Sequence, residues 1–252
     1  MKDCFKNLEK IEFVVTNACT GRCKHCSQGS HETNGRHIDP KIAAETVARL
    51  TERYRLKTVM TFGGEPLLYP DAVYAIMKEA TKAGVPKRQV ITNGYFSKDI
   101  NVIREVAERL AESGVNDLLV SVDAFHGEFI PISVVEAFAT EAKKTGVKVR
   151  TQPAWLCGRL ARNAYNNETE ELLCRFRNLG IEENEGNDIF PEGNAVKYFA
   201  EYFVGRTVEN PYIQDPYNVK CISVDPDGSV LGNNLYTCDI FEIMREYSMK
   251  NC

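Results

Sequence analysis

The stretch AGVPKRQVITNG, residues 83–94, has the order typical of one βα repeat: a glycine that ends a helix, a short apolar strand and a polar turn. The same order recurs three times further along the chain. The later helix ends are predicted at Gly114-Val115, Gly146-Val147 and Gly180-Ile181, and the strands that follow contain LLVSVD, VKVRTQP and NDIF. Successive glycines are 30, 32 and 34 residues apart, which is the length of one βα unit.

Two similar units precede this stretch. The runs IEFVVT (11–16) and KTVMTF (57–62) are strand-like, and helices are expected from Pro40, behind the capping residue Asp39, and from about Pro70. Strands that alternate with helices indicate parallel strands joined by right-handed crossovers. The pattern predicts an α/β fold with six strands and five or six helices. The repeat length alone fits either a barrel or a doubly wound sheet.

Polar motifs follow these strands directly. They are TNACTGRCKHC (16–26), GGEP (63–66), TNG (92–94), SVDAFH (121–126) and TQPAW (151–155). Because parallel α/β sheets bind ligands at the carboxyl ends of their strands, we expect these motifs to build one site.

The composition excludes several classes of protein. A net charge of −4 gives no overall attraction to nucleic acid or anionic lipid. The chain has no signal-like start, and no apolar run approaches the roughly 18 residues of a membrane span. We expect a cytoplasmic protein without a nucleic-acid or membrane partner. Nine cysteines in such a protein indicate metal or redox chemistry rather than disulfides.

Three of the cysteines lie close together in CTGRCKHC (19–26). Their neighbours are polar or charged, which counts against burial in an apolar core. Zinc would need a fourth ligand, for which His25 and His31 are candidates. Three thiolates also suit an iron–sulfur cluster in which one iron stays open for a reactant.

CTGRCKHC resembles the CxxxCxxC signature of the radical S-adenosylmethionine (radical SAM) superfamily. GGEP is similar to that family's methionine-binding motif, and TNG and SVD stand where its later strands carry cofactor contacts. The resemblance covers about residues 11–190 and implies a partial (β/α)6 barrel with parallel strands. It also implies that Cys19, Cys23 and Cys26 hold a 4Fe–4S cluster whose fourth iron binds S-adenosylmethionine.

The same resemblance implies further cofactor contacts. Gly63, Gly64 and Glu65 would meet the methionine ammonium, which suits backbone carbonyls and a carboxylate. The ring of His25 would pack on adenine. The remaining residues expected to bind the cofactor, through its carboxylate or ribose hydroxyls, are Thr92, Asn93, Ser121 and Asp123.

The family chemistry implies reductive cleavage of S-adenosylmethionine to a 5′-deoxyadenosyl radical that abstracts hydrogen from a substrate. A flavodoxin or ferredoxin-type protein would supply the electron. His126 and Glu128, in DAFHGEFIP (123–131), are expected beside the substrate, where either could move a proton.

The last fifty residues are expected to form a small extension, residues 205–252, behind a core of residues 1–204. Residues 205–218 predict a loop, 220–233 a β-hairpin with DPDG as its turn, and 238–247 a closing helix. This segment resembles a degenerate SPASM/Twitch extension, found in radical SAM enzymes that modify peptides. A full auxiliary-cluster set at the usual spacing is not present among Cys157, Cys174, Cys221, Cys238 and Cys252.

Three functions stay open at this point. The favoured one is a radical enzyme that acts on the side chain or backbone of a peptide or protein. The second is a glycyl-radical activase or a radical oxidoreductase with a small-molecule substrate. The third is a zinc or iron–sulfur module without enzymatic activity.

Overall fold

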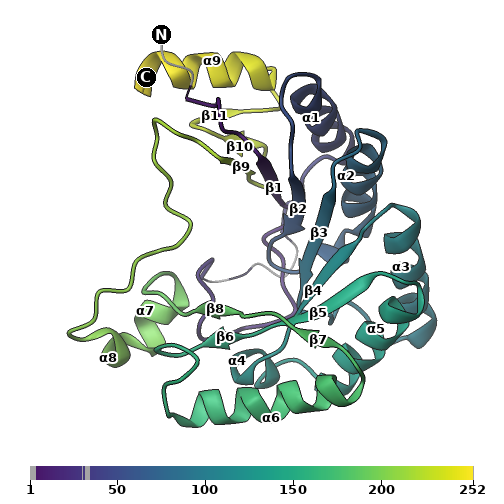
Figure 1. Cartoon of the computed structure of the whole chain (residues 1–252), viewed down its shortest axis with the longest axis vertical. Helices are drawn as coiled ribbons and strands as arrows, with labels where there is room; N and C mark the ends of the chain where they lie inside the picture. The colour runs from purple at the N-terminus through teal and green to yellow at the C-terminus, as the bar shows by residue number, and fades with distance from the viewer. Residues whose placement is uncertain (1–3, 30, 32–34, 252) are drawn as a thin grey trace.

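The computed structural model describes residues 4–29, 31 and 35–251. Its central sheet has seven strands: β1 (Lys10–Val14), β2 (Thr58–Phe62), β3 (Lys87–Thr92), β4 (Asp117–Ser121), β5 (Lys148–Gln152), β7 (Glu182–Glu183) and β9 (Cys221–Val224). Their order is β7-β5-β4-β3-β2-β1-β9, and every pairing is parallel. Figure 1 shows a curved sheet with helices along its outer side, which confirms the predicted partial barrel.

The helices that follow the strands are those that the sequence predicts. They are α1 (Pro40–Arg53), α2 (Pro70–Lys82), α3 (Ile100–Glu112), α5 (Ile132–Lys144) and α6 (Ala164–Asn178). The Asp39 side chain caps α1 by accepting hydrogen bonds from the backbone N–H groups of Lys41 and Ile42, both at 2.9 Å. The four glycines of the repeat all have positive φ, between 66° and 90°, a conformation that ends a helix at little cost only for glycine.

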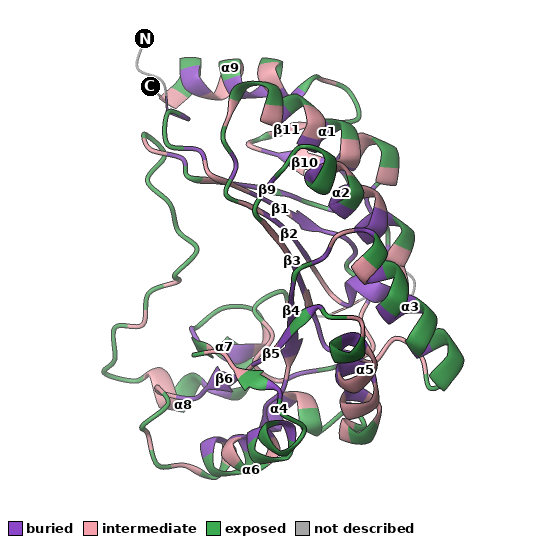
Figure 2. Ribbon diagram, turned by 45° about the vertical axis from the view of Figure 1, so that its right-hand side comes forward, coloured by how far each residue is buried: buried purple, intermediate pink, exposed green. Residues whose placement is uncertain are grey.

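Shorter elements complete the chain between these units. They are the 3₁₀ helix η1 (Pro66–Leu68), the helices α4 (Ala124–Gly127), α7 (Asn194–Tyr198) and α8 (Ala200–Phe203), and the paired strands β6 (Ala154–Trp155) and β8 (Asn187–Asp188). The core lies between the sheet and the outer helices. Figure 2 shows the buried residues concentrated on the strands and on the helix faces turned toward them.

The prediction that NDIF forms the sixth strand of the sheet is wrong. The chain enters the sheet immediately after Gly180-Ile181, where β7 pairs with β5. The NDIF segment instead contributes β8 to a separate two-stranded sheet. Its apolar residue Ile189 packs in a second small core with Phe125 and Phe199, which explains the apolar character that suggested a strand.

The hairpin predicted for residues 220–233 is also wrong. Cys221–Val224 forms β9, which adds to the open edge of β1 in parallel and buries Ile222 and Val224. DPDG does form a turn, since Gly228 N–H donates to Asp225 O at 2.9 Å. The hairpin follows it and joins β10 (Ser229–Val230) to β11 (Asn233–Asn234). Leu231 and Gly232 both have positive φ, as a two-residue hairpin turn requires.

The closing helix is present as α9 (Ile240–Asn251). Ile240, Ile243 and Met244 are buried as predicted, and α9 contacts α1. Within the described part of the chain, no helix combines the length and apolar character needed to cross a bilayer. Because β9 pairs with β1, part of the segment beyond residue 204 belongs to the main sheet. Residues 205–218 form the predicted loop.

Candidate active site

A cavity of about 620 Å³ lies at the carboxyl ends of the parallel strands. It is lined by every predicted site residue except Glu65 and Glu128. These lining residues are Cys19, Cys23, His25, Cys26, Gly63, Gly64, Thr92, Asn93, Ser121, Asp123 and His126. Four separate strand ends thus converge on one site, as the parallel topology predicts.

The three clustered cysteines lie in the loop between β1 and α1. Cys23 is buried with 6% of its surface exposed, and Cys19 and Cys26 are partly buried. Burial raises the pKa of the Cys19 thiol to about 11 and also raises the pKa of Cys26. These thiols are therefore protonated until a cation binds, because metal ligation requires the thiolate.

The three cysteine sulfurs do not all lie within 4.8 Å of one another. Metal-ligand atoms are the sulfur of cysteine, the ring nitrogens of histidine and the carboxylate oxygens of aspartate and glutamate. Among the described residues, one group of three such atoms lies within 4.8 Å of one another, and it belongs to Cys23, His25 and His126. Cys19 and Cys26 are outside that group. The sulfurs of a tetrahedral zinc site lie only about 3.8 Å apart, given zinc–sulfur bonds of about 2.3 Å. The spacing of the three thiols therefore suits a larger centre better than one zinc ion.

His31 lies against the cysteine loop. Its Nε2 atom is 3.1 Å from Cys26 Sγ, and its Nδ1 atom is 3.2 Å from Asn17 O. A carbonyl oxygen only accepts, so Nδ1 is the atom that carries hydrogen in this contact. The structure thus pairs His31 with a single cysteine.

The two glycines after β2 bring backbone against backbone. A Cβ atom on Gly64 would lie 2.1 Å from Ala18 O, and one on Gly63 would lie 2.7 Å from Thr16 O. The N–H groups of Gly64 and Glu65 donate to Thr16 O and Ala18 O at 2.8 and 2.7 Å. Only glycine fits this approach, which fixes the end of β2 against the start of the cysteine loop.

Glu65 lies behind these glycines and is completely buried. Its Oε1 atom accepts hydrogen bonds from Leu67 N–H and the Thr92 hydroxyl, and its Oε2 atom accepts one from Asn93 N–H, at 2.7–2.9 Å. Burial raises the pKa of this carboxyl to about 7 despite these donors. The side chain therefore joins the ends of β2 and β3, and its expected contact with an ammonium group stays a prediction.

The buried Asp123 and the partly buried His126 form a pair in the first turn after β4. His126 Nδ1 is 2.8 and 2.9 Å from the two carboxylate oxygens of Asp123. Burial by itself raises the pKa of Asp123, but the adjacent imidazole outweighs it and lowers that pKa to about 2. Burial likewise acts to lower the pKa of His126, while Asp123 and Cys23 raise it well above its usual value. The pair is ionic at neutral pH.

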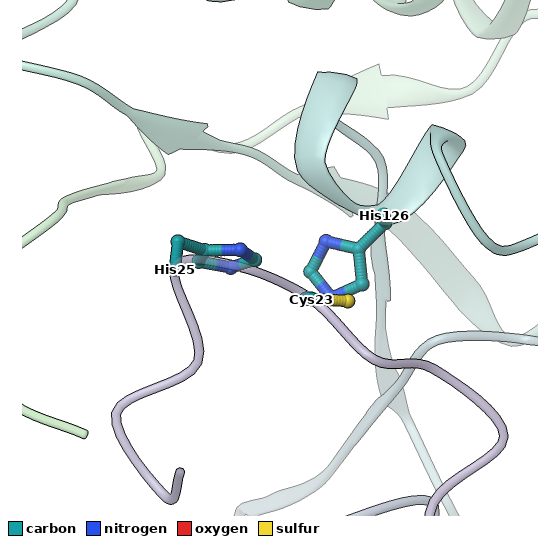
Figure 3. Close-up of side chains that lie close together, drawn as sticks. All are labelled: Cys23, His25 and His126. Atoms are coloured by element: carbon teal, nitrogen blue, oxygen red, sulfur yellow. The ribbon is translucent and has the colours of Figure 1, made fainter. Parts of the chain in front are cut away.

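The ring of His25 packs on Phe125, with the ring centroids 4.9 Å apart, and meets the His126 ring edge-on at the same distance. Its buried Nδ1 atom has no hydrogen-bond partner among the residues that the structure describes. Burial lowers the pKa of this imidazole to about 4, so it is neutral at pH 7. Figure 3 shows Cys23 directly beside the His126 ring, with the His25 ring to one side.

Glu128 lies outside the cavity. Its Oε1 atom pairs with Lys24 Nζ at 2.9 Å, which links the end of α4 to the cysteine loop. Its predicted role in proton transfer has no support from this placement and stays a prediction.

The family model described as Radical SAM superfamily matches residues 13–182, more than half of the chain. The chain belongs to the radical SAM superfamily. The matched range includes the cysteine loop, the glycine pair and the Asp123–His126 pair. A 4Fe–4S cluster with S-adenosylmethionine is the cofactor set characteristic of this family. This finding confirms the resemblance seen in the motifs.

Named relatives act on different substrates. A probable GTP 3′,8-cyclase of Methanocaldococcus jannaschii is 28% identical over 51% of this chain and 41% of its own length. The putative peptide biosynthesis protein YydG of Bacillus subtilis is 22% identical over 53% of this chain and 42% of its own. Streptococcus suis SuiB bound to its precursor peptide SuiA is similar in fold, with a TM-score of 0.65 and 14% identity over 94% of this chain and 65% of SuiB. The chain thus matches less than half the length of these two curated relatives.

The residues present fit the family's cofactors. Three thiols with no ligand role elsewhere in the described structure face one cavity, as a cluster with an open iron requires. The glycine pair keeps backbone groups free of side chains at the cavity wall, and the orphaned Nδ1 atom of His25 is one buried polar group that a bound molecule could satisfy.

A further part of the polar lining, which we call the far wall, consists of residues that the motifs did not indicate. They are Glu12, Asp188, Glu192, Asn210, Tyr212, Gln214, Ser223 and Asp225. Glu12 was detectable as a charged residue inside a buried strand, but the loop residues have no periodic signal. Among the described residues that line the cavity, none is lysine or arginine.

The 205–218 loop is held at this wall by side-chain contacts. Asn210 Nδ2 donates to Glu192 Oε1 at 2.7 Å, and Asn187 Nδ2 donates to the Tyr212 hydroxyl at 3.3 Å. Gln214 bonds the backbone at the start of β9 through both ends of its amide. In Figure 1 this segment crosses the open side of the curved sheet between α8 and β9.

Cysteines outside the loop lie on separated elements. Cys174 is on α6 and Cys238 precedes α9, and these helices lie at opposite ends of the molecule in Figure 1. These two thiols cannot share one auxiliary cluster. Cys252 is outside the described residues.

Proposed function

We propose that this chain cleaves S-adenosylmethionine reductively and uses the resulting radical to abstract hydrogen from a peptide or protein substrate. The observation that carries this proposal is the composition of the cavity lining. One part of the lining is the cysteine loop and the glycine pair, and the far wall is rich in carboxylates and amides; among the described residues that line the cavity, none is lysine or arginine.

The charge of the cavity favours a peptide over a nucleotide triphosphate. A triphosphate carries several negative charges, and proteins meet it with arginine, lysine or helix N-termini. Here the far wall offers four carboxylates, and the one at Glu12 is paired with Lys10 at 2.6 Å. Amide and hydroxyl side chains on the same wall can pair with the polar backbone of a peptide. We therefore expect this chain to act on a substrate other than GTP, although it is similar to GTP 3′,8-cyclases.

Two of the similar proteins support the same substrate class. YydG is named as a putative peptide biosynthesis protein, and SuiB is seen with a precursor peptide bound. The SPASM/Twitch-like character of residues 205–252, inferred from the sequence, belongs to this proposal. A flavodoxin or ferredoxin-type protein is the proposed electron donor.

Residues of this chain would hold the cofactors as follows. Cys19, Cys23 and Cys26 would ligate the cluster, and the backbone of Gly63 and Gly64 would accept the methionine ammonium. The neighbouring hydroxyl and amide groups of Thr92, Asn93 and Ser121 would bond the carboxylate or the ribose. When bound, these cofactors supply a 5′-deoxyadenosyl radical that removes hydrogen from an unactivated carbon.

The protein positions these groups and limits water. Glu65 fixes the β2 and β3 ends relative to each other through three hydrogen bonds, so the glycine backbone and the Thr92 turn keep one arrangement. Phe125 and the neutral His25 ring form an apolar floor beside the cysteine loop. A dry site protects a radical from side reactions.

The proposal is tested with anaerobically reconstituted protein, excess S-adenosylmethionine and a chemical reductant. Candidate peptides, including any short peptide encoded beside the gene, are prepared with deuterium in place of carbon-bound hydrogen. We expect 5′-deoxyadenosine that carries one deuterium, and none from Cys23→Ala. GTP, added in parallel, should be neither consumed nor stimulatory. Absence of 5′-deoxyadenosine in the reduced protein, or consumption of GTP, would contradict the proposal.

A further inference from the structure

Asp123 uses both carboxylate oxygens inside the protein. Oδ1 accepts the His126 backbone N–H at 2.9 Å and lies 2.8 Å from His126 Nδ1. Oδ2 lies 2.9 Å from the same Nδ1 atom and accepts Ala154 N–H at 3.1 Å. Asp123 has 1% of its surface exposed, and its hydrogen bonds are made to His126 and to the backbone of β6. This geometry differs from that of a carboxylate presented to a ribose diol.

The other side of the His126 ring faces a cysteine of the loop. The ligand atoms of Cys23, His25 and His126 lie within 4.8 Å of one another, so the Cys23 sulfur is a near neighbour of the His126 ring. Because Asp123 occupies Nδ1, the nitrogen at the sulfur is Nε2. Figure 3 shows the sulfur against the His126 ring, with α4 presenting the ring from one side and the cysteine loop passing on the other.

The contact is confined by packing. The His25 ring stands edge-on to His126 at a centroid distance of 4.9 Å, and Cys23 itself is 6% exposed. A ring held between a carboxylate and a thiolate has acceptors at both nitrogens, so each nitrogen carries hydrogen and donates. A hydrogen bond to a ligating sulfur withdraws electron density from it and favours the reduced form of an iron–sulfur cluster.

We propose that Asp123 is a positioning residue that holds His126 so that Nε2–H donates a hydrogen bond to the Cys23 sulfur, and that this bond raises the reduction potential of the cluster. The inference rests on the proposed function, since it requires the cluster. It assigns Asp123 to His126 rather than to the ribose, and it assigns His126 to the cluster rather than to proton transfer at the substrate. The Asp123–His126–Cys23 chain of contacts thereby makes the first electron transfer easier.

The experiment compares midpoint potentials, measured by electron paramagnetic resonance during redox titration, for the reconstituted holoprotein and its variants. His126→Leu removes the donor, His126→Gln keeps an N–H that can reach the sulfur, and Asp123→Asn weakens the hold on the ring. Asp99→Asn is the matched control, because Asp99 caps α3 through Asn101 N–H, away from the cysteine loop. Iron per chain and thermal unfolding are recorded for each variant.

We expect the midpoint to shift to more negative values in His126→Leu, to a smaller extent in Asp123→Asn, and to return toward wild type in His126→Gln, with iron content unchanged. Asp99→Asn should keep the wild-type midpoint. Equal midpoints in wild type, His126→Leu and Asp123→Asn would overturn the inference while the proposed function stands. Loss of iron from His126→Leu to the level of Cys23→Ala would also overturn it, because His126 would then be an iron ligand. Wild-type protein that takes up no cluster would overturn the proposed function itself.

Discussion

The two walls of the cavity are built in different ways. The wall at the cysteine loop consists of buried groups held by short hydrogen bonds, such as Glu65 and Asp123, and of glycines that admit no side chain. The far wall consists mostly of exposed side chains on β8, the 205–218 loop and β9, together with Glu12 and Glu192. The first wall is suited to hold one defined cofactor, and the second can adapt to a substrate at small structural cost. The predictions below test this division, beginning with the largest expected effect.

Cys23→Ala should abolish cluster assembly and all cleavage of S-adenosylmethionine. Cys23 is the most buried of the three loop cysteines. Iron analysis and 5′-deoxyadenosine formation measure the effect. Cys174→Ala, an exposed position on α6, is the control and should keep wild-type iron content. Equal loss of iron in Cys23→Ala and Cys174→Ala would contradict the assignment of the cluster to the cysteine loop.

Gly64→Ala should destabilise the fold by about 3 kcal/mol, because the new Cβ would lie 2.1 Å from a backbone oxygen that cannot rotate away. Urea unfolding measures the change. Gly127→Ala is the matched control, since its Cβ would lie 3.3 Å from the end of the Leu172 side chain, which can move. Similar stabilities for the two variants would show that the glycine wall is loosely packed.

Glu65 should make stability depend on pH. Its pKa of about 7 in the folded protein is above the ordinary value of 4.5 for this carboxyl, so the folded state binds the proton more tightly than the unfolded state. The associated stability is complete below pH 4.5 and is lost as the pH rises through 7, for a total of roughly 3 kcal/mol.

Denaturant unfolding of wild type and Glu65→Gln between pH 4.5 and 8 measures this contribution. The glutamine variant cannot ionise, so the difference between the two proteins should change across this range in favour of the variant at high pH. A difference that stays constant with pH would mean that the Glu65 carboxyl does not titrate there.

Tyr212→Ala should weaken substrate binding about 5-fold, or roughly 1 kcal/mol, and leave substrate-independent cleavage of S-adenosylmethionine unchanged. Tyr212 lines the far wall and packs edge-on against Phe190, with centroids 5.9 Å apart. Tyr217→Ala, an exposed position in the same loop that does not line the cavity, is the control. A reduced rate of uncoupled cleavage in Tyr212→Ala would place this residue on the cofactor wall instead.

The same division explains what could be predicted from the sequence. The cofactor wall was predictable because it needs particular residue types at strand ends: cysteines at fixed spacing, glycines where backbones meet, and Asp123 at a helix start. The contacts between these residues could not be predicted from the sequence. Those of Glu65 with Thr92 and of His126 with Cys23 depend on how separate strand ends meet in space.

The far wall was not predictable, because exposed polar residues in a loop follow no periodic pattern. The end of the sheet was mistaken for a related reason. NDIF and residues 220–233 have the apolar content of strands, but pairing depends on which sheet edge is free. β9 pairs with the open edge of β1, whereas β8 pairs with β6 in a separate sheet.

The central claim is that three thiols hold a cluster with one iron open to S-adenosylmethionine. The most direct measurement is the electron paramagnetic resonance spectrum of the anaerobically reconstituted, reduced protein before and after addition of S-adenosylmethionine. The account predicts about four irons per chain and a reduced-cluster signal that changes when S-adenosylmethionine is added. A colourless protein that binds one zinc ion, or a cluster signal that S-adenosylmethionine leaves unchanged, would contradict it.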